Sequence, residues 1–248
     1  GRHGATPTED GQLAFEYCDK IFTQAEELVA SLKEGSPAAA PSFRLGVSQT
    51  ISWRKTVELV HRARAAGGNV FVRVYNRSSE ELQDWLERCM LDLVVSDIDL
   101  SVRMGKNYKS RLVADTSLYF VASPAVKRRV RGFPGGLARV PLLMCSASNP
   151  VRKGADHFLR RSGVIPDIHA ESETPDLIRI LALQGDGVGL VDPAAVDLDI
   201  KQGRLVKLHR NPIGIRENIW FICDRREKAR PELRAILDVL MADFKFKV

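Results

Sequence analysis

The stretch NVFVRVYNRSSEELQDWLERCMLDLVVSD, residues 69–97, decides the fold that the sequence predicts. An alternating run at 70–75 predicts a strand, and the Ser78/Ser79 pair is typical of the N-cap of the helix that follows. A fully apolar run at 91–95 then predicts a buried strand. Because a strand, helix and strand in this order require a crossover connection, the two strands are expected to be parallel in one sheet.

The same alternation extends in both directions along the chain. Further strands are predicted at 43–47, 117–123, 141–145, 167–172, 188–192, 205–212 and 217–226. Further helices are predicted at 53–65, 151–163, 175–187 and 231–244, the last beginning with a proline at a favoured first-turn position. This order indicates an α/β fold made of two half-sized α/β units.

The N-terminal segment predicts a long helix that Thr8 caps with its hydroxyl. Apolar residues recur there at alternating steps of four and three, which is an a/d heptad seam: Ala14, Cys18, Ile21, Ala25, Leu28 and Leu32. The small, proline-containing stretch SPAAAPS, residues 36–42, resembles a linker. A helix packed on its own domain is the alternative, but the linker favours a coiled-coil dimerisation arm.

Composition and cysteine usage exclude several classes of protein. No stretch approaches the roughly 20 apolar residues of a membrane span, and the start has no secretory signal pattern, so a cytoplasmic protein is expected. The four cysteines are widely scattered, which suggests neither a zinc site nor a disulfide framework, and they are expected to be small buried hydrophobes. The net charge of +6 is interpreted as a basic surface without a nucleic-acid role, despite clusters at 127–131 and 225–230.

Catalytic and cofactor motifs are also missing from the sequence. There is no P-loop, no G-x-S-x-G and no H-E-x-x-H, and the histidines are isolated. GDGVGL, residues 185–190, follows a helix instead of opening one, so its first glycines are interpreted as the helix stop and not as a dinucleotide fingerprint. No catalytic residue, cofactor or metal is therefore predicted.

Small hydroxyl residues stand repeatedly where predicted strands end, at Ser48 and Thr50, Ser78 and Ser79, Ser96, Ser146, and Ser172 and Thr174. Hydroxyls beside free helix amides can receive a carboxylate or phosphate, and ligands in open parallel sheets bind at the carboxyl ends of strands. The alternative is that each is simply an N-cap. Asp97 and Asp99 could bind a cation or act as acid and base, but a solvated or capping role is favoured.

The order of these pieces resembles a LysR-type transcriptional regulator along essentially the whole chain. The resemblance is carried by T-P-T-E-D-G at a helix start, a long amphipathic helix, a linker, R-L-G-V, S-S-E-E-L, L-D-L-V-V-S-D and G-D-G-V-G-L-V. The G-R-x-G-x-x-P-T-E-D-G start with Y-C-D-K-I-F is similar to the branch of that family that includes the activator of sodium/proton antiporter genes.

The resemblance implies two Rossmann-like subdomains of periplasmic-binding-protein type II architecture behind a dimerisation helix. The implied parts are a remnant of the winged helix-turn-helix wing at 1–8, the dimerisation helix at 9–35, a hinge at 36–42, subdomain I at 43–119 with 217–248, and subdomain II at 120–216. DNA would be bound through a helix-turn-helix domain that is absent from this chain. A homodimer or homotetramer, without membrane contact, is the expected assembly.

The resemblance also implies an effector site in the cleft between the subdomains. Transferred by position, the candidate residues are Ser48, Gln49, Thr50, Ser96, Asp97, Ser146 and Thr174. Asp97 departs from the family pattern. An acid in the cleft disfavours a carboxylate effector and leaves room for a cation or an amine. Effector binding would shift the relative orientation of the subdomains and so reach the DNA-binding domains.

Two alternatives remain open at this point, and both use the same cleft. One is a solute-binding protein acting alone, and the other is a cytoplasmic α/β enzyme.

Overall fold

The computed structural model describes residues 41–225, 231–244 and 246, together with isolated positions nearer the N-terminus. Those positions are 8, 10, 11, 14, 17, 18, 21 and 25. The Thr8 hydroxyl accepts a hydrogen bond of 3.1 Å from the backbone amide of Gly11, which confirms the predicted N-cap. The expected wing remnant up to residue 7, Leu28 and Leu32 of the seam, and hinge residues 36–40 lie outside the described residues.

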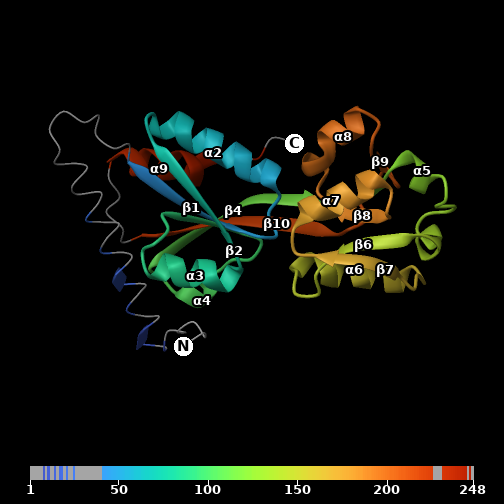
Figure 1. The fold of residues 1–248 in the computed structure, drawn as a ribbon, viewed down its shortest axis with the longest axis horizontal. Coiled ribbons are helices and arrows are strands. Elements are labelled where there is room, and N and C mark those ends of the chain that lie inside the picture. The colour runs from blue at the N-terminus through green and yellow to red at the C-terminus, as the bar shows by residue number, and fades with distance from the viewer. Residues whose placement is uncertain are drawn as a thin grey trace, which may run out of the picture.

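The first unit is a five-stranded sheet with the order β2-β1-β3-β10-β4. Its strands are β1 (Ser42–Ser48), β2 (Phe71–Arg77), β3 (Leu93–Ser96), β4 (Tyr108–Ser117) and β10 (Arg216–Asp224). Its helices are α2 (Trp53–Gly67), α3 (Ser79–Glu87), α4 (Ser101–Met104) and α9 (Pro231–Asp243). Figure 1 shows α2 and α9 on one face of this sheet and α3 and α4 on the other. The strands β1, β2 and β3 are parallel, as predicted.

The second unit is a five-stranded sheet with the order β7-β6-β8-β5-β9. Its strands are β5 (Tyr119–Ala122), β6 (Pro141–Cys145), β7 (Asp167–Ser172), β8 (Val188–Val191) and β9 (Val206–Lys207). Its helical elements are α5 (Pro124–Lys127), η1 (Gly135–Arg139), α6 (Pro150–Arg161), α7 (Pro175–Gln184), η2 (Pro193–Val196) and α8 (Asp197–Lys201). The helix α6 lies on the side of the sheet opposite to α7 (Figure 1).

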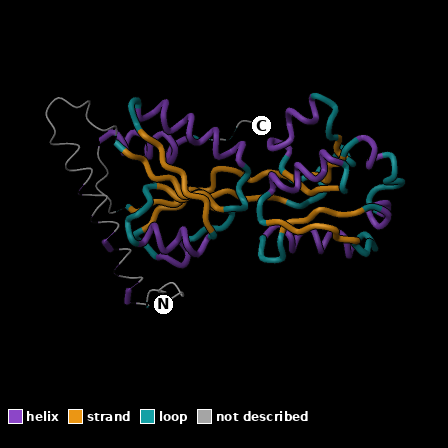
Figure 2. Tube along the Cα trace, viewed as in Figure 1, coloured by secondary structure: helices purple, strands orange, loops and turns teal. Residues whose placement is uncertain are grey.

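The chain crosses between the two units twice, along neighbouring strands. The strands β4 and β10 pair antiparallel, and the ladder continues to Leu118, whose amide donates a 2.9 Å hydrogen bond to the carbonyl of Ile215. Figure 2 shows these paired strands running from one unit toward the other. Tyr119 lies in the second sheet and Arg216 in the first, one residue away from the expected subdomain boundaries.

The core of the first unit has two layers, because β1 and β3 are covered by helices on both faces. Leu45 and Val95 pack with Leu59 of α2, while Val94 packs on the opposite face with Leu82 of α3. This arrangement explains the continuous apolar runs from which both strands were predicted, since parallel strands buried on both faces need no polar alternation.

Several sequence expectations are corrected by the structure. The strand β4 was not predicted, because YKSRLVADTS mixes charged and apolar residues and pairs only at a sheet edge. The strand expected at 205–212 is reduced to Val206–Lys207. The expected hinge ends before Ser42, which begins β1.

The cysteine expectation was wrong for two of the four residues. Cys18 and Cys89 are exposed, whereas Cys145 is half-buried and Cys223 is buried. The helix α3 ends at Glu87, and Cys89 follows it on the surface with a positive φ of 56°. Gly185 ends α7 with a φ of 90°, which confirms its predicted role as a helix stop.

Candidate functional site

The carboxyl ends of three parallel strands of the first sheet meet at one edge. The register pairs Ser48 of β1 with Arg77 of β2, and Val47 of β1 with Val95 of β3. The turns after these strands therefore emerge side by side, which is where ligands bind in open parallel sheets.

The second sheet presents an equivalent edge. Cys145 of β6 pairs with Ser172 of β7, so the segments that follow the two strands run next to each other. Asn149 begins α6 by accepting a 2.8 Å hydrogen bond from the amide of Val151 through its side chain, and Pro150 occupies the first helical turn. Glu173 follows β7 directly.

A cavity of about 140 Å³ lies between these two edges, and we call it the cleft cavity. Its lining residues come from both subdomains. The first subdomain contributes Ser48, Gln49, Thr50, Ser78, Ser79, Glu80, Asp97 and Ile98, and the second contributes Ser148, Asn149, Pro150 and Glu173. Most of the lining residues thus carry a hydroxyl, amide or carboxylate group.

A smaller chamber of about 30 Å³ adjoins the cleft cavity and shares Thr50, Asn149 and Glu173 with it. We call it the inner chamber. Much of its wall is apolar, with Leu118, Val151, Pro175, Ile178, Leu190, Val191 and Ala195 among its lining residues. Its volume is enough for a water molecule or for one small group of a larger ligand.

Three buried charged side chains form an interdomain contact at the wall of the inner chamber, and we call them the hinge cluster. Lys55 of α2 lies 2.8 Å from the Asp192 carboxylate, which follows β8, and pairs closely with Glu217 of β10. Burial raises the pKa of Glu217 above its usual range. Burial alone would lower the pKa of Lys55, but the two carboxylates outweigh it and the pKa is raised. Lys55 therefore remains an ammonium group that joins the two subdomains.

The N-terminus of α2 is capped from the other subdomain. The amide of Trp53 donates a 2.8 Å hydrogen bond to the carboxylate of Asp176 in α7. Ser52 occupies the N-cap position of α2, but its hydroxyl makes no cap hydrogen bond. That hydroxyl is buried without any hydrogen-bond partner, and Ser52 lines the inner chamber.

The structure brings four of the seven predicted site residues to the cleft cavity, namely Ser48, Gln49, Thr50 and Asp97. The other three line neither chamber. Ser96 is fully buried, and its hydroxyl accepts a 3.2 Å hydrogen bond from the amide of Ile98. The Ser146 hydroxyl lies 2.9 Å from that of Ser148, and Thr174 occupies the N-cap position of α7.

Sequence reasoning missed the contributions of Glu80, Asn149 and Glu173. The Ser78/Ser79 cap was recognised, and Ser78 indeed forms a capping box with Glu81, but the turn was not assigned to the site. The Asn149-Pro150 pair is a helix-start signal that could have identified the second wall. Glu173 stands between two residues that were singled out, Ser172 and Thr174.

The two aspartates of the SDIDL stretch have different roles. Asp99 accepts hydrogen bonds from the amide and hydroxyl of Ser101 and from the hydroxyl of Ser110, a local turn contact just before α4, whose N-cap position is Leu100. Asp97 is half-buried in the wall of the cleft cavity. Burial raises its pKa, and hydrogen bonds from the hydroxyls of Thr50 and Ser96 oppose that rise.

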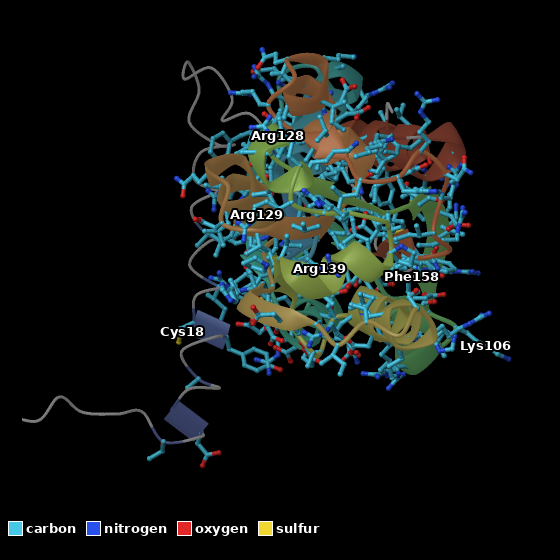
Figure 3. All side chains as sticks on the ribbon, turned by 90° about the vertical axis from the view of Figure 1, so that its right-hand side faces the viewer. Cys18, Lys106, Arg128, Arg129, Arg139 and Phe158 are labelled. Carbon is cyan, nitrogen blue, oxygen red and sulfur yellow. The ribbon has the colours of Figure 1, made fainter. Side chains whose placement is uncertain are left out.

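In the basic clusters that the sequence shows at 127–131 and 225–230, the described residues do not line the cleft cavity. Figure 3 looks onto the end of the second subdomain and shows Arg128, Arg129 and Arg139 spread over that end. None of these three lines the cleft cavity or the inner chamber. In the second predicted cluster, Arg225 is exposed and residues 226–230 lie outside the described part of the chain.

The described part of the chain offers neither a metal cluster nor a membrane-spanning helix. It contains no group of three histidine, cysteine, aspartate or glutamate residues placed to hold a metal ion. In the same residues, no helix combines the length and apolar character that a membrane crossing requires.

Residues 38–245 match the LysR substrate binding domain family, which is most of the chain. Over 114 residues the chain is 27% identical to the transcriptional activator protein NhaR of Escherichia coli (strain K12) and to that of Shigella flexneri. This match covers 42% of the chain and only 37% of the length of those curated relatives.

Solved structures share the fold at low sequence identity. The apo regulatory domain of HypT from Salmonella typhimurium has a TM-score of 0.68 at 16% identity, covering 82% of this chain and 97% of that one. The structure of Vibrio fischeri DarR in complex with DNA has a TM-score of 0.67 at 15% identity, covering 96% of this chain and 80% of that one.

Two five-stranded sheets joined by two crossing strands define the periplasmic-binding-protein type II fold. The chain belongs to the LysR substrate binding domain family.

Proposed function

We propose that the cleft cavity binds a small molecule or ion and that this binding controls the DNA binding of the complete regulator. The observation that carries the proposal is the two-sided wall of the cavity. A ligand there touches Gln49 and Asp97 of one subdomain and Ser148 and Glu173 of the other. Such a ligand favours the subdomain orientation in which both sets of contacts are made.

Oligomerisation through the N-terminal helix is part of the same proposal. The described seam residues Ala14, Cys18, Ile21 and Ala25 are helical and exposed, with Ile21 exposing 62% of its surface. An exposed isoleucine in a heptad seam fits a helix that pairs with a second copy. The dimer or tetramer would carry the orientation change to an N-terminal helix-turn-helix domain bound to DNA in the cytoplasm.

The function requires binding and no chemical step. A solute-binding protein acting alone and an α/β enzyme remain the rival functions for the same cavity. The match over residues 38–245 supports the regulator, because that family consists of transcription factors. Recovery of the ligand unchanged after prolonged incubation with the protein, measured by mass spectrometry, separates a sensor from an enzyme.

The proposal is tested by calorimetry on two cavity variants, one from each subdomain. A thermal-shift screen of organic acids, amines, amino acids and alkali salts at matched ionic strength first selects a ligand. Gln49→Ala and Ser148→Ala are each expected to weaken its binding by about threefold to tenfold, because each removes a polar contact. Asn218→Ala, at an exposed position of β10 outside the cavity, is the control. Wild-type affinity in both cavity variants would show that the ligand binds elsewhere.

A further inference from the structure

Three carboxylates line the cleft cavity, and we call them the cleft carboxylates. Glu80 lies in the first turn of α3, Asp97 follows β3 and Glu173 follows β7. None of the three makes an ion pair with another described residue, and no described lysine or arginine lines the cavity. The whole chain carries a net charge of +6, so the excess of acidic side chains is a local property of the cavity wall.

The surroundings of Asp97 favour the arrival of a positive group. Its carboxylate is half-buried, and Glu80 adds a second negative charge nearby, so that burial and repulsion together raise its pKa. The hydroxyls of Thr50 and Ser96 stabilise the charged form only in part. A cation held between Asp97 and Glu80 would remove the repulsion between them.

The Ser52 hydroxyl is a second, independent sign of a ligand. Ser52 is only 3% exposed, and its hydroxyl oxygen has no hydrogen-bond partner in the described structure. Asp176 caps α2 in place of Ser52, so the Ser52 hydroxyl does not accept a hydrogen bond from the first turn of the helix. An unpaired buried hydroxyl costs free energy, and a polar group reaching the inner chamber would satisfy it.

The residues in the walls of the inner chamber indicate which part of a ligand would lie there. Three carboxylates line this chamber. Asp192 and Glu217 are paired with Lys55, and Glu173, which has no such partner among the described residues, is shared with the cleft cavity, so the unpaired charge lies toward the outer cavity. Otherwise the inner chamber has largely apolar walls. It therefore suits a short aliphatic portion with one polar atom near Ser52, while the positive group stays in the outer cavity.

A bare metal ion does not fit these walls. The cleft carboxylates are too dispersed to form a metal-binding group among the described residues, and the cleft cavity of about 140 Å³ has room for an organic molecule. We propose that the effector is a small organic cation, an aliphatic amine whose ammonium group is bound by the cleft carboxylates. This inference rests on the proposed function and names the ligand class of the same site.

The test compares probes of one shape that differ in charge. Pentylamine, 1-pentanol and pentanoate are titrated into the protein by calorimetry, together with 1,4-diaminobutane and with sodium, lithium and magnesium chloride at matched ionic strength. The amines are expected to bind and to raise the Tm, the alcohol to bind at least tenfold more weakly, and pentanoate not to bind. Tighter binding of pentanoate, or stabilisation by the metal salts alone, would overturn the proposal.

Variants then locate the ammonium group and the aliphatic portion. Glu80→Gln, Asp97→Asn and Glu173→Gln are each expected to weaken pentylamine binding by about threefold to tenfold, because each removes a negative charge that attracts the ammonium group. Glu87→Gln is the matched control, since Glu87 is an exposed carboxylate at the other end of α3. Ser52→Ala is expected to weaken the binding of 5-amino-1-pentanol and to leave the Tm of the free protein unchanged or higher.

The outcomes separate this inference from the proposed function. An acid or a neutral probe could bind, with its affinity weakened by Gln49→Ala and Ser148→Ala. The cleft would then be the effector site, but the proposal that the effector is an organic cation would be wrong. If amines bind with the same affinity in all three carboxylate variants, the cation is bound elsewhere and both proposals fail. If none of the amines binds, the proposal that the effector is an organic cation is also overturned.

Discussion

Two sets of charged groups lie at the junction of the subdomains, and they differ in whether their charges are paired. In the hinge cluster, Lys55 pairs with buried carboxylates from both subdomains. The cleft carboxylates, a short distance away in the same cleft, have no basic partner among the described residues. Acidic residues at one junction can therefore serve two purposes. Paired carboxylates hold the subdomains together, whereas unpaired ones are available to a ligand.

The largest effect is expected from breaking the hinge cluster. Lys55→Met should lower the free energy of unfolding by about 3–5 kcal/mol, because it leaves two buried carboxylates without a cation. Urea unfolding followed by circular dichroism measures the change. Lys153→Met, at an exposed position of α6, is the control and should stay within about 0.5 kcal/mol of the wild type.

A triple variant sharpens this prediction. Lys55→Met combined with Asp192→Asn and Glu217→Gln should be more stable than Lys55→Met alone, since no unpaired buried charge remains. A triple variant less stable than the single one would mean that packing around the Lys55 side chain, and not its charge, dominates the loss.

A smaller effect is expected from the cap that one subdomain provides for the other. Asp176→Ala should destabilise the protein by about 1 kcal/mol, because the amide of Trp53 loses its acceptor at the N-terminus of α2. Thermal unfolding measures the difference, and Asp186→Ala, at an exposed position of the same subdomain, is the control. An unchanged Tm would show that water or the Ser52 hydroxyl replaces the cap without loss.

The smallest effect concerns the cleft carboxylates and depends on pH. The pKa of Asp97 is raised above its usual value of 3.8, so the folded protein holds this proton more tightly than the unfolded chain does. Its contribution to stability therefore falls as the pH rises from the usual pKa through the raised one. Asp97→Asn should have a higher Tm than the wild type at pH 7, and the difference should shrink toward about pH 3.5.

Glu80 provides the check on this pH dependence, because its charge is one cause of the raised pKa. In Glu80→Gln the stability change assigned to Asp97 should move to lower pH. Thermal unfolding of both variants between about pH 3.5 and pH 7 gives the comparison. A Tm difference between Asp97→Asn and the wild type that does not vary with pH would contradict the assignment.

The sequence predicted best the strands that are buried on both faces and the helices that begin with a local capping signal. The strands β1 and β3 carry continuous apolar runs because helices cover both of their faces, and α3 begins with a capping box that can be recognised locally. The strand β4 was missed because its exposed and buried residues do not alternate cleanly and its pairing with β10 joins distant parts of the chain.

The sequence predicted only the wall of the cleft cavity that the first subdomain contributes. Residues 48–50 and Asp97 follow strands that are obvious in the sequence, and the carboxyl ends of parallel strands must share an edge. Ser96, Ser146 and Thr174 were chosen by the same rule but do not line the cavity. The hydroxyls of Ser96 and Ser146 make local hydrogen bonds, and Thr174 occupies the N-cap position of α7, since small hydroxyl residues often complete turns and caps instead of binding ligands. Glu173 carries no local pattern that distinguishes it from any exposed acid.

The sequence by itself determined the α/β class, the alternation of strands and helices and the starting points of most helices, because periodicity and capping act over a few residues. Only the tertiary structure decided that Lys55, Asp192 and Glu217 form one cluster, that Asp176 caps α2, and that Glu80, Asp97 and Glu173 line one cavity. The physical reason is that each of these contacts joins residues that are far apart in the chain. Whether a buried charge is paired is decided by the packing of the two subdomains and not by neighbouring residues.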